Sequence, residues 1–194
     1  KKQNIKNNKF KKLEKNLKKY KLKVCFIGRV TVSKGIDHIL NFSRIFKYND
    51  QIIFYIAGAT DLYFKKKLIK FKKKNKIRNL ILNLDGVDNE DVCSLYSLFD
   101  TSFHLSNIPE GTSYSIMESM ISKCVPIANY SSEMISNNCG YVLENFKYHQ
   151  IEKILSDHLF ENNLKKLKTN TSAHIKKNYN EKVLIKKYKK VLSI

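Results

Sequence analysis

The sequence predicts an α/β protein built on a doubly wound parallel sheet of about six strands, followed by C-terminal helices. Three observations support this fold class. Short apolar runs alternate with stretches whose apolar residues recur at helical spacing. The run IIFYIA at 52–57 is continuously apolar, which is typical of a strand covered on both faces. The connections between runs are short, which favours strand–helix–strand units in a parallel sheet.

The same patterns give the expected elements in chain order. The sequence predicts strands over 22–30, 52–57, 80–82, 101–105, 125–128 and 141–143. It predicts helices over 35–47, 61–75, 89–99 and from Thr112 or Ser113 to about 121, with two or three more in 148–194. The expected buried stripe of the helix over 61–75 comprises Leu62, Phe64, Leu68 and Phe71, and its lysines form a solvated face. Residues 1–20 are polar and basic and are expected to lie outside the core.

The charge of the 194-residue chain is +20, which raises nucleic acids and anionic membranes as partner classes. Arginine occurs only at 29, 44 and 78, so lysine supplies nearly all of the 37 basic residues. Because nucleic-acid readers rely on arginine for forked contacts, nucleic acid is not expected as a partner. An anionic membrane surface is a candidate partner. No apolar run approaches the ~20 residues of a membrane-spanning helix, and no signal peptide is expected.

The cysteines and histidines show no pattern of a metal site. Cys25, Cys93 and Cys124 lie in apolar strand or helix patterns, and none of the four cysteines forms a close pair in sequence. They are expected to be buried free thiols in a reducing compartment, which predicts a cytoplasmic protein. The five histidines are scattered, so no bound metal is expected.

The most informative stretch is 103–127, which predicts a strand, a loop, a helix and a second strand. Thr112 or Ser113 is expected to cap the helix with its hydroxyl. Glu110 precedes this helix start and Glu118 lies about two turns inside the helix. The free amides between them suit a phosphate, and the carboxylates suit sugar or ribose hydroxyls, so the stretch predicts a nucleotide-sugar site. The alternative is a capped surface helix with two solvated glutamates.

A second candidate cluster follows the first strand. Arg29 and Lys34 lie across the turn between Gly28 and Gly35, and two cations there would neutralise a diphosphate. The alternative is two ordinary surface cations. Ligands of parallel sheets bind at the carboxyl ends of the strands. One site is therefore expected from the loops at 28–35, 58–61, 84–88, 106–112 and 129–134. No GxxxxGK[ST] or GxGxxG motif is present, which argues against a P-loop or an ordinary dinucleotide fold.

Taken in order, these motifs resemble family 4 of the retaining glycosyltransferases. The matching residues are Gly28-Arg29, Lys34-Gly35, Ile56-Ala57-Gly58, Asp85-Gly86-Val87, the loop 106–111 and the Glu110/Glu118 pair. The resemblance covers about 21–143 and corresponds to the Rossmann-like, C-terminal donor-binding half of the GT-B fold. It implies a basic linker or helix at 1–20 that leads from a missing N-terminal domain, a nucleotide-sugar-binding domain at 21–177 and a C-terminal helix at 178–194.

The resemblance also implies roles for individual residues. Arg29 and Lys34 would hold the donor diphosphate and stabilise the leaving group, and Glu110 would bind hydroxyls of the transferred sugar. Glu118 would bind the ribose. The remaining donor-binding residues would be Gly28, Ser106, the amides of Gly111, Thr112 and Ser113, and Gly86 and Val87 beside the base. The family needs no metal in this half, so no cofactor is expected, and the substrate would be a UDP-, GDP- or ADP-sugar.

The sequence departs from the family at two loops. Gly-Thr-Ser-Tyr at 111–114 replaces a run such as Gly-Phe-Gly, and the loop at 129–133 lacks both glycines of a Gly-Gly-x-x-Glu motif. Glu133 is therefore only a candidate for that motif's glutamate.

The implied function is that of a hexosyltransferase or related glycosyltransferase that transfers sugar with retention. The acceptor would be a glycan or a lipid-linked molecule bound through the missing half. The expected setting is the synthesis of cell-envelope polysaccharide, lipid-linked glycan or glycolipid at the inner face of the membrane. The alternatives are a nucleotide-sugar epimerase of similar fold and a non-catalytic module that binds polyanions or membranes.

Overall fold

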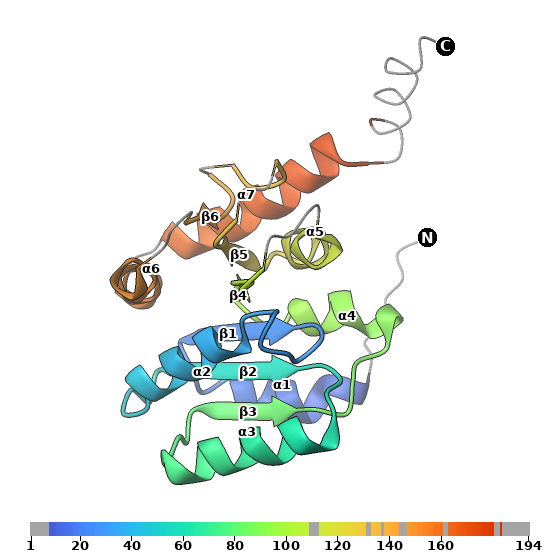
Figure 1. Cartoon of the computed structure of the whole chain (residues 1–194). Helices are drawn as coiled ribbons and strands as arrows, with labels where there is room; N and C mark the ends of the chain where they lie inside the picture. The colour runs from blue at the N-terminus through green and yellow to red at the C-terminus, as the bar shows by residue number, and fades with distance from the viewer. Residues whose placement is uncertain are drawn as a thin grey trace.

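The computed structural model describes residues 8–108, 113–130, 133–136, 138–143, 147–160, 163–180 and 183. It contains a six-stranded sheet in the order β3-β2-β1-β4-β5-β6, in which every pairing is parallel. The expectation of a doubly wound parallel sheet is thereby confirmed (Figure 1). The strands are β1 Leu22–Ile27, β2 Ile52–Ala57, β3 Leu80–Asn83, β4 Thr101–His104, β5 Val125–Ala128 and β6 Tyr141–Val142.

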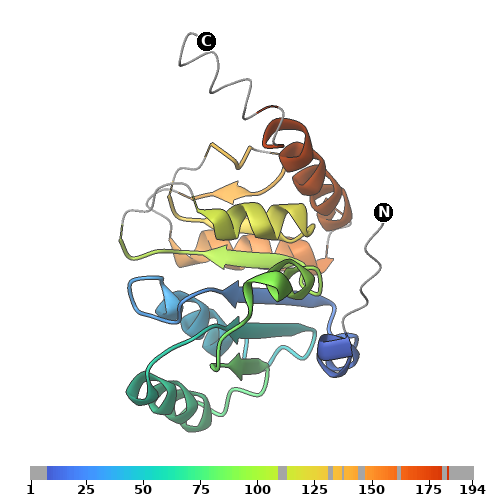
Figure 2. The same ribbon diagram turned by 90° about the vertical axis from the view of Figure 1, so that its right-hand side faces the viewer.

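The helices cover both faces of this sheet. Apolar residues of α2, α3 and α6 pack with one face, and apolar residues of α1, α4, α5 and α7 pack with the other. The bounds are α1 Lys11–Leu17, α2 Ile36–Ile45, α3 Leu62–Lys74, α4 Asn89–Tyr96, α5 Tyr114–Ile121, α6 Tyr148–Phe160 and α7 Asn163–Asn178, with a 3-10 turn at Asn8–Phe10. Figure 2 shows α5 and α7 on the same side of the sheet, where Ser172 donates to the carbonyl of Ile121 at 3.2 Å. Among the described helices, none is both long and apolar enough to cross a lipid bilayer.

Strand β1 shows why the sequence forms such layers. Its side chains alternate between the two faces, with Val24 and Phe26 in one apolar cluster and Cys25 and Ile27 in the other. All four are buried, so both faces of the strand lose their apolar surface to helices. The continuous apolar run therefore marks a central strand.

Several boundaries and burial predictions were wrong. The strand predicted over 22–30 ends at Ile27, and the helix predicted over 89–99 ends at Tyr96. Residues 8–20 do not all lie outside the core, because Leu17 is only 2% exposed and packs with Phe10 and Leu13 beside the sheet. Leu62 was expected in the buried stripe but is 76% exposed at the first turn of α3.

The cysteine prediction was wrong for one residue. Cys25, Cys124 and Cys139 are buried free thiols, whereas Cys93 is exposed on α4. Cys25 and Cys124 come together in space, with their sulfur atoms 4.0 Å apart. Burial raises the pKa of the Cys25 thiol well above its ordinary value, so this thiol is protonated at neutral pH.

Candidate functional site

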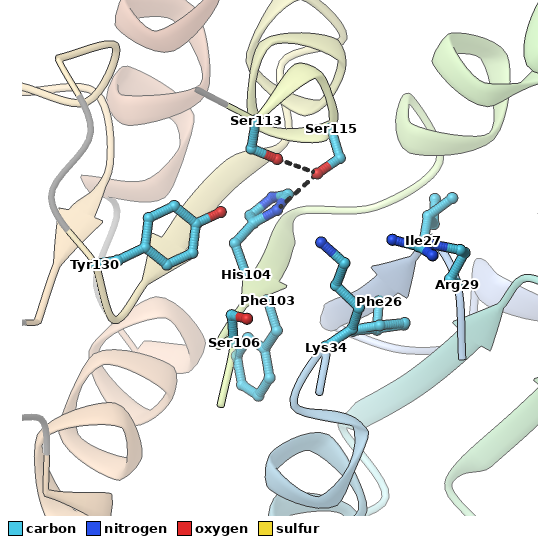
Figure 3. Close-up of a pocket in the computed structure, with 11 residues that line it drawn as sticks. Phe26, Ile27, Arg29, Lys34, Phe103, His104, Ser106, Ser113, Ser115 and Tyr130 are labelled. Carbon is cyan, nitrogen blue, oxygen red and sulfur yellow. Dashed lines mark hydrogen bonds between the residues drawn. The ribbon is translucent and has the colours of Figure 1, made fainter. Parts of the chain in front are cut away.

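A pocket opens where the strand order reverses, between the carboxyl ends of β1 and β4. β4 pairs with β5 along its whole length, whereas β1 pairs with β4 only at Val24–Thr101 and Cys25–Ser102. Beyond these pairs lies a cavity of about 80 Å³ (Figure 3). Its lining residues are Phe26, Ile27, Gly28, Arg29, Lys34, Phe103, His104, Ser106, Ser113, Ser115 and Tyr130. A reversal of strand order is the usual ligand site of an open parallel sheet.

The turn after β1 depends on Gly35. Its φ is +73°, and a Cβ atom built there would lie 1.4 Å from the carbonyl oxygen of Leu105. Only glycine can hold this conformation while the start of α2 approaches the end of β4 so closely. The expectation that Gly35 permits a close approach is confirmed, and the approach brings Lys34 to the cavity.

Polar side chains after β4 hold this turn in place. The Ser106 hydroxyl donates to the carbonyl oxygen of Ser33 at 2.9 Å. Asn107 Nδ2 donates to the carbonyl oxygen of Val32 at 2.8 Å and to Asp37 Oδ1 at 2.9 Å. The side chains therefore fix residues 31–34 against the strand that forms the opposite wall of the pocket.

The charge of the pocket is positive. In Figure 3, Arg29 and Lys34 lie on one side, and Ser113, Ser115 and Tyr130 lie on the other. Among the described residues that line the cavity, none carries a carboxylate. Two cations opposite hydroxyl groups suit an anion whose oxygens accept hydrogen bonds, such as a phosphate.

Buried polar groups continue from the pocket into the protein. His104 Nε2 lies 2.9 Å from Ser102 Oγ, and His104 Nδ1 lies 3.3 Å from Ser115 Oγ. Ser115 Oγ lies 2.7 Å from Ser113 Oγ. Ser113 is the N-cap residue of α5, but its hydroxyl makes no capping bond, so the predicted capping role is wrong for this side chain. Burial lowers the pKa of His104 to about 3, and the imidazole is neutral at physiological pH.

The structure brings together part of the predicted site. Gly28, Arg29, Lys34, Ser106 and Ser113 line one cavity. Glu110, Gly111 and Thr112 lie outside the described residues. Gly86, Val87, Glu118 and Glu133 are described but are not among the residues that line the cavity.

Glu118 lies on α5, beside α4. Its side chain is half-buried, and burial raises the pKa of its carboxyl group. Burial is the main cause that raises the pKa of Tyr96, and the charge of Glu118 makes a smaller contribution in the same direction. The Tyr96 hydroxyl donates to the carbonyl oxygen of Ile27, at the carboxyl end of β1, at 3.2 Å.

The other predicted residues lie on separate loops. Gly86 has a φ of +97° in the loop after β3, and Val87 packs partly buried beside the core cluster that contains Tyr96. Glu133 is exposed, and its carbonyl oxygen accepts a bond from the Tyr179 hydroxyl at 2.8 Å.

Sequence reasoning missed four residues that build the pocket: His104, Asn107, Ser115 and Tyr130. The sequence contains only a weak signal for these residues. His104 is a polar residue at the last position of a buried strand, which is a place where a polar side chain needs a partner. Among the described residues, no group of three or more His, Cys, Asp or Glu side chains is arranged to hold a metal ion.

Comparison with known proteins identifies the family. Residues 6–182 match the family described as Glycosyl transferases group 1, and the chain belongs to that family. It is 29% identical over 181 residues to a protein described as an uncharacterized glycosyltransferase of Methanocaldococcus jannaschii, covering 89% of this chain and 45% of that protein. The chain thus spans less than half the length of this curated relative.

Solved structures share the fold. The C-terminal domain of LpcC, a group 1 glycosyl transferase of Francisella tularensis, superposes with a TM-score of 0.73 at 24% identity, over 87% of this chain and 92% of that one. HepE of Anabaena, solved in complex with UDP and glucose, superposes with a TM-score of 0.77 at 14% identity, over 94% of this chain and 51% of that one. At these identities the likeness establishes the fold.

Proposed function

We propose that this chain is the donor-binding half of a retaining glycosyltransferase that binds a nucleoside-diphosphate sugar. The observation that carries the proposal is the pocket at the reversal of strand order, where Arg29 and Lys34 face the start of α5. Membership in the Glycosyl transferases group 1 family supports transfer chemistry over the epimerase alternative. The structural neighbour HepE was solved with UDP and glucose, which supports a UDP-sugar as the first donor to test.

The proposed roles divide the donor into its parts. The diphosphate lies between Arg29 and Lys34 and the first amides of α5, where the leaving group gains negative charge as the bond to the sugar breaks. Glu118 accepts bonds from the ribose hydroxyls. Glu110 binds the transferred sugar, the amides of Gly111 to Ser113 hold the distal phosphate, and the loop at Gly86 and Val87 contacts the base. These roles need no bound metal or other cofactor.

Transfer with retention requires an acceptor as the second substrate. The acceptor is proposed to be a glycan or a lipid-linked molecule held by an N-terminal half, and the leaving phosphate helps to remove its proton. The proposed setting is the synthesis of cell-envelope polysaccharide, lipid-linked glycan or glycolipid on the cytoplasmic side of the membrane.

Donor binding is tested by a thermal-shift screen of UDP-, GDP- and ADP-sugars, followed by calorimetric titration of the best ligand. Glu118→Ala is expected to weaken binding by about 1–3 kcal/mol, since the ribose hydroxyls lose their acceptor. Glu152→Ala, on α6 at the other face of the sheet, is the matched control and leaves affinity unchanged. Equal affinities for wild type and Glu118→Ala would refute the proposal that Glu118 binds the ribose.

The surface formed by residues 62–78 favours peripheral membrane association as a second property of the chain. The segment 62–78 carries nine basic residues and no acidic residue, and Leu62, Tyr63 and Ile69 are exposed on it. Anionic lipid headgroups match this charge, and the apolar side chains suit the headgroup boundary. Sedimentation with vesicles of phosphatidylglycerol and phosphatidylcholine tests it. Binding that depends on the anionic lipid is expected. Equal binding to DNA, with no response to any nucleotide-sugar, would instead favour the polyanion-binding module.

A further inference from the structure

A row of hydroxyl and imidazole groups runs from the interior to the pocket beneath the start of α5. It begins at Ser102 on β4, which contacts the His104 ring. It continues through Ser115 and ends at Ser113 on the wall of the cavity, and Figure 3 shows this part from His104 to Ser113. The three contacts measure 2.9, 3.3 and 2.7 Å. His104 is only 8% exposed, so its two ring nitrogens depend on these hydroxyls as partners.

The hydrogens of this row can point in two directions. A neutral imidazole has one N–H donor and one nitrogen acceptor. If Nδ1 of His104 carries the hydrogen, it donates to Ser115, Ser115 donates to Ser113, and the Ser113 hydrogen is left for the cavity. If Nε2 carries it, His104 donates to Ser102, Ser113 donates to Ser115, and Ser115 donates to Nδ1. Every group keeps one hydrogen in both arrangements, and only the direction of donation changes.

The chemistry of the cavity distinguishes these two directions. Arg29 and Lys34 make the cavity suitable for an anion. Among the described residues that line the cavity, the other two titratable side chains are His104 and Tyr130. A phosphate oxygen can only accept hydrogen bonds. The first direction gives such an oxygen a hydroxyl donor at Ser113, whereas the second presents a lone pair that repels it.

We propose that His104, acting through Ser115, directs the Ser113 hydroxyl at a phosphate oxygen of the bound donor, and that donor binding selects the tautomer with hydrogen on Nδ1. His104 is thus a positioning residue that contributes no charge. The inference rests on the proposed function, because its ligand is the donor diphosphate. It adds a side-chain donor to the site and assigns the residue that orients it.

Calorimetric titration with UDP tests the linkage between the hydroxyls. Ser113→Ala is expected to weaken UDP binding roughly tenfold and Ser115→Ala roughly fivefold, as for the loss of a hydrogen bond to a charged group. The double variant should lose no more than roughly tenfold, because both changes remove the same donor. Ser119→Ala is the matched control, since its buried hydroxyl donates within α5 to the carbonyl of Ile116. A double variant that loses roughly fiftyfold, the product of independent effects, would overturn the linkage.

The tautomer is read by ¹⁵N NMR of histidine-labelled protein, with the His104 signal identified by its loss in His104→Gln. In the UDP complex, the expected form carries hydrogen on Nδ1 alone. A complex with hydrogen on Nε2, or on both nitrogens, would overturn the inference. If wild type binds UDP and Arg29→Ala weakens binding while Ser113→Ala does not, only the inference fails. If wild type binds neither UDP nor a nucleotide-sugar, the proposed function fails as well.

Discussion

Asn107 attaches the turn that carries Lys34 to the end of β4. Its Nδ2 donates to the carbonyl oxygen of Val32 at 2.8 Å and to Asp37 at 2.9 Å, and its Oδ1 lies 2.8 Å from His38 Nε2. Asn107→Ala removes all three side-chain bonds and introduces no clash, because it only shortens the side chain. The substitution therefore tests whether this attachment positions Lys34.

The expected magnitude follows from the exposure of the contacts. A hydrogen bond contributes about 1 kcal/mol net, and water replaces part of it at an exposed residue such as Asn107. Three lost bonds are therefore expected to lower the free energy of unfolding by about 1–2 kcal/mol. Affinity for a UDP-sugar should fall about threefold to tenfold, since the released turn must then be ordered when the donor binds.

Urea unfolding followed by circular dichroism measures the first effect, and calorimetric titration measures the second. Asn41→Ala on α2 is the matched control, because among the described residues the Asn41 side chain accepts one bond, from Arg44 at 2.9 Å. It should change both quantities by much less. If Asn107→Ala lowers stability but leaves donor affinity at the wild-type value, the attachment is structural only and the reasoning is refuted.

Two further predictions concern stability. Burial lowers the pKa of His104 to about 3 and that of His158 to about 4, so both rings stay neutral in the folded state while an unfolded chain protonates them below about pH 6.5. These two rings therefore do not lower the free energy of unfolding above pH 6.5. Below that pH, the free energy of unfolding falls by up to about 1.4 kcal/mol per histidine per pH unit toward pH 4. Urea unfolding at pH 7.5, 6 and 5 measures this slope, which His158→Gln should reduce; an unchanged slope in that variant would contradict it. Gly35→Ala should cost more than about 3 kcal/mol, whereas Gly86→Ala, whose added Cβ would meet nothing closer than 3.9 Å, should cost about 1 kcal/mol. If urea unfolding shows equal losses of stability in the two variants, the close approach of Gly35 to Leu105 is not the reason that position 35 requires glycine.

The fold was predictable because each strand and helix is marked by an apolar pattern within its own short segment of sequence. A fully apolar run such as 52–57 marks a strand buried on both faces, and each helix shows its own apolar stripe. The convergence of Gly28, Arg29, Lys34, Ser106 and Ser113 was predictable for a topological reason. In a parallel sheet, segments that follow the strands meet at one edge.

The remaining features depend on contacts between distant segments. Leu17 lies in a lysine-rich stretch and is buried only because α1 packs near α4 and the sheet. Asn107 binds residues about 70 positions earlier, which no local pattern reveals. His104 faces the first turn of α5 because β1 and β4 stop pairing just before the pocket, and that separation is a tertiary property. Leu62 shows the converse, since its spacing is that of a buried stripe but its side chain at the start of α3 is exposed to solvent.

In the proposed function, the cavity between β1 and β4 holds the diphosphate of a nucleotide-sugar. Its most direct test is calorimetric titration of UDP-glucose into wild type, Arg29→Ala and Arg78→Ala, which removes an exposed arginine of the loop before β3. Arg29→Ala is expected to lose at least tenfold in affinity, as for the loss of a charged hydrogen-bond donor, while Arg78→Ala should match wild type. Equal losses in the two variants, or no loss in either, would contradict it.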